Sequence, residues 1–180
     1  QSFLETFALA TKLANPAIIL KRELMWIPFF GWYLWKARAV PINRGSRAAA
    51  VAAMNAGAAA EVAAGRHLLI FAEGTRRPPG AEPAYKQGFS HMYAALNTPI
   101  LPVAMNTGLY WPRRQFIRRP GTAIIEFLPI VPAGLPREEA FIRVRDVIEA
   151  ACARLLEEGR AELGEQAFRE AMSWRDHATA

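Results

Sequence analysis

The sequence has little of what several classes of protein require. Its 180 residues include one cysteine, Cys152, so no disulfide can form within the chain, which is typical of a reducing compartment. No apolar run is long enough to cross a bilayer, because the richest one, residues 24–35, is short and contains a proline and a glycine. His67 and His91 lack the spacing of metal ligands, and we therefore expect no metal site.

Charge is abundant and unbalanced. Lysine and arginine number 22 against 16 acidic residues, so the formal net charge is +6 and the isoelectric point is about 10.0. A basic chain favours an acidic partner, such as nucleic acid, an anionic membrane or a phosphorylated substrate. Zinc-finger spacing, an RNP-like aromatic pattern and a long Lys/Arg run are all missing, so we expect no nucleic-acid partner. The hydrophobic share of 52% excludes intrinsic disorder.

The apolar pattern alternates between strand-like and helix-like segments. Strands are predicted at residues 17–20, 39–42, 68–71, 100–104 and 122–127. Helices are predicted at residues 2–14, 46–65 and 88–96. A long amphipathic helix should begin at Pro136 and end at Gly159, followed by a polar, loosely packed helical tail over residues 160–180. This alternation predicts one α/β domain, residues 1–159, with a mostly parallel central sheet flanked by helices.

The most informative segment is the end of the apolar run at residues 68–71. It is followed by Glu73, Gly74, Thr75 and Arg76, and ligands in parallel α/β folds bind where strands end. Glycine lets the backbone approach a phosphate closely, the threonine hydroxyl donates a hydrogen bond, and arginine supplies a planar cationic fork. The segment therefore indicates a phosphate-monoester site, and the alternative is a strand end with a surface arginine.

The chain resembles the glycerophospholipid acyltransferase family, in particular the 1-acylglycerol-3-phosphate acyltransferases, through an ordered set of motifs. Residues 27–31 (Ile-Pro-Phe-Phe-Gly, with Pro28 and Gly31) and Asn43-Arg44 are similar to the family's second block. Residues 71–76 are similar to its third block, with Ala72 where proline is usual, and residues 99–102, ending in Pro102, to its fourth. The resemblance extends from Gln1 to about Met105. It implies the family's fold, a glycerolipid acyltransferase-like α/β domain.

The family's first block is a histidine followed five residues later by aspartate. Residues 1–5 fit the positions after that histidine, which would then immediately precede Gln1, and Glu5 takes the place of the aspartate. The resemblance implies that Glu5 orients this histidine and that the sequence is an N-terminally truncated catalytic domain. Ser2 and Glu5 also form a capping-box pattern, and the two roles are compatible.

The resemblance further implies an activity and its residues. A fatty acyl group would pass from acyl-CoA or acyl-carrier protein to the free hydroxyl of 1-acylglycerol-3-phosphate, giving phosphatidic acid, with no other cofactor. Arg76 and Arg44 would bind the acceptor phosphate, with Gly74 and Thr75 shaping the loop and Lys86 as a further candidate. The expected location is the cytoplasmic face of the plasma membrane. Two alternatives stay open, namely another lysolipid acceptor, such as an amino-acid-linked one, and a non-catalytic phospholipid-binding domain.

Three further features have two interpretations each. Residues 23–36 predict short helices and contain three tryptophans, which could face a membrane or an acyl chain, or could pack in the core. Residues 111–119 combine four arginines with aromatics and suit either an anionic lipid or acyl-donor phosphate, or a solvated loop. Cys152 falls on the apolar face of its helix, which favours a structural thiol over a nucleophile.

Overall fold

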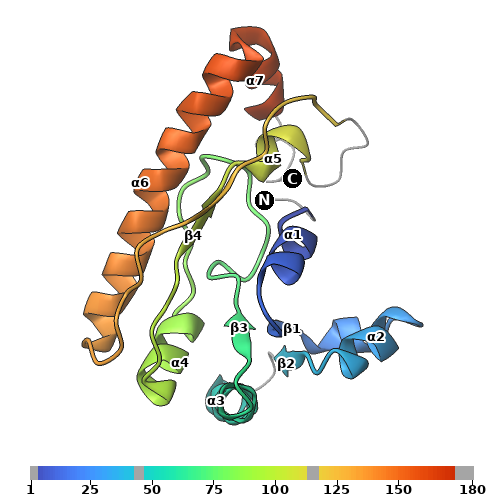
Figure 1. Cartoon of the computed structure of the whole chain (residues 1–180), viewed down its shortest axis with the longest axis vertical. Coiled ribbons are helices and arrows are strands. Elements are labelled where there is room, and N and C mark those ends of the chain that lie inside the picture. Colours follow the sequence, from blue (N-terminus) through green and yellow to red (C-terminus); the bar gives the residue numbers. More distant parts are fainter. Residues whose placement is uncertain (1–3, 43–46, 113–117, 173–180) are drawn as a thin grey trace.

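A computed structural model describes residues 4–42, 47–112 and 118–172 (Figure 1). Its helices are α1 (Leu4–Lys12), the 3-10 helix η1 (Arg22–Trp26), α2 (Phe30–Lys36), α3 (Arg47–Ala63), α4 (Gly88–Leu96), α5 (Thr107–Tyr110), α6 (Arg137–Leu163) and α7 (Glu165–Met172). Its strands are β1 (Pro16–Lys21), β2 (Val40–Ile42), β3 (His67–Leu69), β4 (Val103–Met105) and β5 (Ile125–Phe127).

The central sheet has the strand order β2-β1-β3, and both pairings are parallel. Ile18 is in register with Leu69, and Lys21 with Ile42. The predicted α/β domain with a parallel sheet flanked by helices is confirmed. The two later strands differ from expectation, because β4 and β5 form a separate antiparallel pair and Ile100 makes only an isolated bridge to Val131.

Helix α3 covers the parallel sheet through small and flexible side chains. Met54 and Ala58 are buried against Ile19 and Val40. A side chain at Gly57 would also come close to the sheet, since its Cβ would lie 3.1 Å from Val40 Cγ1. The alanine-rich sequence of α3 therefore serves close packing, because a larger residue on this face would push the helix away from the strands.

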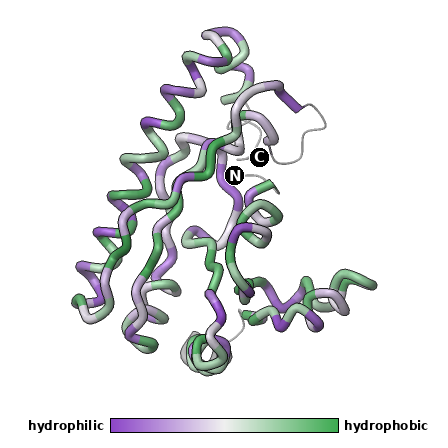
Figure 2. The backbone as a smooth tube through the Cα atoms, in the orientation of Figure 1, coloured by the Kyte–Doolittle hydropathy of each residue, from purple (hydrophilic) through white to green (hydrophobic). Residues whose placement is uncertain are grey.

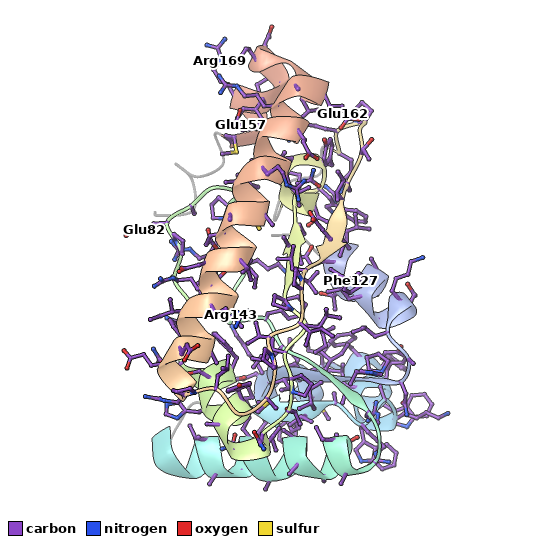
Figure 3. All side chains as sticks on the ribbon, turned by 60° about the vertical axis from the view of Figure 1, so that its left-hand side comes forward. Glu82, Phe127, Arg143, Glu157, Glu162 and Arg169 are labelled. Carbon is purple, nitrogen blue, oxygen red and sulfur yellow. The ribbon has the colours of Figure 1, made fainter. Side chains whose placement is uncertain are left out.

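Helix α6 spans the length of the molecule and alternates hydrophilic with hydrophobic residues (Figure 2). Val144, Ala151 and Leu155 are buried as predicted, while the solvent face carries charged side chains such as those of Arg143 and Glu157 (Figure 3). The predicted end at Gly159 is wrong. Gly159 packs against α5, where an added Cβ would lie 2.5 Å from Leu109 Cδ1, and the helix continues to Leu163.

The polar tail expected from residue 160 is helical but is not loosely packed. Ala171 in α7 is fully buried, and Phe168 packs with it against Leu109 and Tyr110 of α5. Helix α7 is therefore part of the same hydrophobic core as α5. The positions beyond residue 172 lie outside the described residues.

Arg66 cross-links the segments that lead into the parallel strands. Its guanidinium donates to the carbonyl oxygens of Pro16 (2.6 Å) and Ala37 (2.9 Å), to Glu61 Oε2 (2.5 Å) and to Asn15 Oδ1 (3.1 Å). Pro16 begins β1 and Arg66 itself precedes β3, so this buried arginine closes the amino-terminal edge of the sheet. The loops that follow the three strands leave from the opposite edge, where the carboxyl ends of the strands lie.

This network predicts a specific dependence of stability on pH. Burial raises the pKa of Glu61, but hydrogen bonds and charge from Arg66 and Arg38 outweigh it, so the pKa lies below its ordinary value. The contribution of ionised Glu61 to the free energy of unfolding is thus complete above its unfolded-state pKa of about 4.3. It is lost as the pH falls through the lower folded-state pKa. Urea unfolding between about pH 3 and pH 7 measures it.

Two variants isolate the effect. Glu61→Gln should cost about 3 kcal/mol at neutral pH, because it leaves the buried Arg66 without its counter-charge, and it should flatten the acid limb of the stability curve. Glu158→Gln removes the exposed ion pair with Arg154. It should change little in either the stability at neutral pH or the acid limb of the stability curve. An unchanged acid limb in Glu61→Gln would contradict this account.

Candidate active site

The carboxyl ends of β1, β2 and β3 share one edge of the sheet because all three strands are parallel. Strand β2 ends at Ile42, two residues before Arg44, which lies outside the described residues. Strand β3 ends at Leu69, earlier than the predicted Phe71, and the chain then reaches Glu73. The second and third sequence blocks therefore leave the sheet at the same edge, where such folds bind ligands.

The loop after β3 turns at Gly74. Its φ of 65° is a left-handed conformation that strains any other residue, and its N–H donates to the Phe71 carbonyl (2.9 Å). An added Cβ would meet nothing closer than Lys86 Cγ at 3.8 Å, so the conformation, and not crowding, requires glycine. Thr75 and Lys86 are exposed and Arg76 is half-buried. The structure thus brings Lys86 next to the phosphate-site loop predicted from the sequence.

Glu73 organises this loop. Its Oε1 accepts the Ala84 N–H (3.1 Å) and lies 3.7 Å from Arg77 Nε, while the Lys86 N–H donates to the Ala72 carbonyl (2.8 Å). These contacts close the proline-rich segment of residues 77–83. The geometry gives Glu73 a structural role in shaping the turn that presents Thr75 and Arg76.

Tyr85 ties the same loop to helix α6. Its hydroxyl donates to Glu149 Oε1 at 2.8 Å, and burial, together with this carboxylate, raises the pKa of Tyr85 above its ordinary value. The phenol stays neutral at physiological pH and keeps donating. The loop is therefore held from both sides, by Glu73 within it and by Glu149 from outside.

Glu5 lies in the first turn of α1 and is only 1% exposed. Its Oε2 accepts a hydrogen bond from Thr107 Oγ1 at 3.0 Å, and Thr107 is fully buried. Figure 1 shows the start of α1 above the parallel sheet, on the side from which the chain leaves β3. Ser2 lies outside the described residues, so the capping-box role stays a prediction.

Sequence reasoning missed Thr107. The residue lies beyond the fourth block, which ends at Pro102, and it opens α5 just after the end of β4. Its neighbour Asn106, also buried, anchors that point: Oδ1 accepts the Ile124 N–H (2.7 Å) and Nδ2 donates to the Leu155 carbonyl (3.4 Å). The sequence signal that could have identified Thr107 is a pair of polar residues, Asn106 and Thr107, at the carboxyl end of a strand.

Of the three remaining block residues, Gly31 and Pro102 have packing roles. Gly31 is buried within α2, where an added Cβ would lie 1.9 Å from the Met25 carbonyl oxygen, so only glycine lets α2 approach η1. The preceding Pro28 is exposed. Pro102 is buried, and its carbonyl accepts the Leu128 N–H at 2.9 Å, which extends the pairing of β4 with β5.

The aromatic segment does not pack in the core. Trp26, Trp32 and Trp35 are 77%, 64% and 69% exposed, and Phe29 and Tyr33 are exposed as well. Helix α2 projects from the body of the molecule (Figure 1). The core-packing interpretation of these tryptophans is therefore wrong, and the surface interpretation stays open.

Other candidate groups have ordinary roles. Burial raises the pKa of the half-buried Cys152 thiol, which argues against a nucleophile. His67 Nδ1 lies 2.8 Å from the Ala14 carbonyl, and the described residues contain no cluster of His, Cys, Asp and Glu that could hold a metal ion. Arg118 stacks over Trp111 at 4.4 Å, while residues 113–117 lie outside the described part.

Two further features of the described residues bear on ligand and membrane binding. A hollow of about 430 Å³ lined by Leu163 and Glu170 lies at the junction of α6 and α7, away from the loops at the sheet's carboxyl edge. None of the helices in the described ranges is long and apolar enough to span a membrane.

Comparisons with known proteins place the chain in a family. Residues 2–106 match the Acyltransferase family, and the chain belongs to it. It is 34% identical over 133 residues to the 1-acyl-sn-glycerol-3-phosphate acyltransferase of Pseudomonas aeruginosa (74% of this chain, 52% of the relative). It is 33% identical over 160 residues to the enzyme of the same name from Salmonella typhimurium (87% of this chain, 63% of the relative).

A solved structure agrees with these relatives. The crystal structure of the 1-acyl-sn-glycerophosphate (LPA) acyltransferase PlsC from Thermotoga maritima matches with a TM-score of 0.61 and 27% sequence identity, covering 79% of this chain and 57% of that one. The family predicted from the sequence blocks is confirmed. The chain spans about half the length of the first curated relatives it matches.

Proposed function

We propose that this chain is the catalytic domain of a 1-acylglycerol-3-phosphate acyltransferase. It transfers a fatty acyl group from acyl-CoA or acyl-carrier protein to the free hydroxyl of 1-acylglycerol-3-phosphate, giving phosphatidic acid and a free thiol. The observation that supports the proposal is that β2, which leads to Arg44 of the second block, and β3, which leads to the third block, end at the same edge of the parallel sheet. The names of the relatives support the acceptor and the product.

The reaction needs a base because a hydroxyl is a poor nucleophile until its proton is removed. In the proposed mechanism, a histidine immediately before Gln1 takes this proton, and Glu5 orients the imidazole and stabilises its charged form. The acceptor oxygen then attacks the thioester carbonyl, the carbon–sulfur bond breaks, and the thiolate leaving group receives the proton. No acyl-enzyme forms.

Arg76 and Arg44 act by positioning. Holding the acceptor phosphate fixes the distance between its hydroxyl and the base, which converts an encounter of two molecules into a reaction within one complex. The fixed turn at Gly74, closed by Glu73, presents Thr75 and Arg76 to that phosphate. Lys86 adds a cation beside the turn.

The exposed aromatic surface of η1 and α2 is proposed to contact the membrane that supplies the acceptor, at the cytoplasmic face of the plasma membrane. Tryptophan and tyrosine favour the headgroup region, where the ring is apolar and the polar tip remains hydrated. Exposed cations flank the surface: Lys21, Arg22 and Lys36. The combination suits an anionic bilayer, which attracts basic residues near its surface.

The activity is tested with the full-length protein, which the proposal requires to carry a histidine immediately before Gln1. Thiol release from palmitoyl-CoA, and separately from palmitoyl-acyl-carrier protein, is followed with and without lysophosphatidate. Release from either donor should depend on lysophosphatidate. In Arg76→Ala, KM for lysophosphatidate should rise at least about tenfold, because the phosphate loses a bidentate partner. Arg76→Lys should be intermediate, since it keeps the charge but not the fork.

A matched glycine pair separates the loop's function from its stability. Gly74 and Gly65 both have positive φ (65° and 71°) with open space around the missing Cβ. Each Gly→Ala variant should therefore cost about 1 kcal/mol of stability, but only Gly74→Ala should raise KM. Equal kinetics for the two variants would remove the loop from the phosphate site.

A panel of other lysolipids identifies a different acceptor, and binding without turnover on any acceptor and donor would indicate a non-catalytic domain.

The membrane proposal has its own test. The double variant Trp32→Ala/Trp35→Ala should lower partitioning into vesicles containing phosphatidylglycerol by about tenfold, because each indole loses its interfacial contact. Ile130→Ala, another exposed apolar residue that lies far from α2 in the sequence, serves as the control and should partition like the parent. Equal partitioning of the tryptophan variant and the parent would contradict a membrane role for this surface.

A further inference from the structure

A buried hydroxyl–carboxylate contact joins two segments that are distant in sequence. Thr107 Oγ1 donates to Glu5 Oε2 at 3.0 Å across 102 residues of chain, and both side chains are almost completely shielded from solvent. A hydrogen bond to a charged acceptor is stronger than one between neutral groups, and low polarity around it strengthens it further. Loss of the donor would leave a buried carboxylate with less compensation for its lost hydration.

The contact also restricts the carboxylate's orientation. Glutamate has one more rotatable bond than aspartate, so a glutamate that orients a base needs an additional restraint to hold one geometry. Thr107 supplies it at Oε2. Because a carboxylate has two oxygens and about four acceptor positions, this hydrogen bond is compatible with a further donor such as an imidazole N–H.

Thr107 itself is held firmly. Asn106, the preceding residue, bonds to Ile124, just before β5, and to Leu155 of α6, and the Trp111 N–H donates to the Thr107 carbonyl at 2.9 Å. Leu109 of the same helix is fully buried against α6, where Gly159 leaves room for it. The hydroxyl therefore projects from a rigid part of the fold.

We propose that Thr107 is a positioning residue that orients the Glu5 carboxylate, so that the base relay runs from Thr107 through Glu5 to the histidine. This inference rests on the proposed function, because it assumes that Glu5 orients the base. It adds a residue outside the acyltransferase blocks recognised in the sequence. It also provides a physical reason why glutamate serves at position 5.

The test compares Thr107→Val, which removes the hydroxyl with little change in shape, with Thr107→Ser, which keeps it. In the full-length protein, Thr107→Val should lower kcat about 10- to 100-fold, the scale of one lost hydrogen bond to a charged group. KM for lysophosphatidate should change little, since the phosphate loop is untouched. Thr107→Ser should recover most of the activity. Equal losses in the two variants would overturn the proposal.

A matched control and a double variant exclude a general structural effect. Thr122 Oγ1 makes a similar contact with Glu162 (2.8 Å) on the exposed surface, so Thr122→Val should leave kcat unchanged. In the Glu5→Gln background, Thr107→Val should lower kcat by much less than in the parent, because two residues of one relay are not additive. Full additivity would show that Thr107 acts independently of Glu5.

The same set separates the inference from the proposed function. A Glu5→Gln variant with normal kcat would remove the base relay and the inference with it. A large loss in Glu5→Gln together with normal kcat in Thr107→Val would leave the relay and overturn only the role of Thr107. Unfolding by urea, measured for every variant, confirms that the comparison is between folded proteins.

Discussion

The proposed site depends on one constraint, the buried carboxylate of Glu5. Removing a charge from water costs several kcal/mol unless it is hydrogen-bonded, so its surroundings must supply donors. Thr107 provides one, and the amino terminus of α1, where Glu5 occupies the first turn, favours negative charge. The fold supplies the Thr107 donor by bringing the end of β4 to the beginning of α1.

The parallel sheet has one edge that a buried ion pair closes and an opposite edge from which the loops of the proposed site leave. Arg66 and Glu61 close the amino-terminal edge with a buried ion pair and several hydrogen bonds to carbonyl oxygens. The other edge carries the loop at Gly74 and the segment that leads to Arg44. This separation would leave the loop sequences free for the proposed ligand binding, because the strands are held in register from the opposite end.

The parts of the fold that depend on local pattern were predictable from the sequence. Helix α4 spans the predicted residues 88–96, the buried face of α6 was identified, and the loop at Glu73–Arg76 follows the predicted strand, which ends at Leu69. Features set by distant contacts were not. Gly159 is of the residue type that commonly ends a helix, but here it is a point of close approach to Leu109. The Glu5–Thr107 contact has no local signature, and apolar composition alone could not show that the tryptophans of η1 and α2 face outward.

The most direct test of the account is kcat of Glu5→Gln in the full-length protein at saturating lysophosphatidate and acyl thioester, with Glu82→Gln, a change at an exposed glutamate, as control. If Glu5 orients the base, kcat should fall by about 10²- to 10⁴-fold while the free energy of unfolding changes by only about 1 kcal/mol, because the amide keeps an oxygen that accepts from Thr107. A folded Glu5→Gln protein with kcat near that of the parent would contradict the account and leave Glu5 a structural residue.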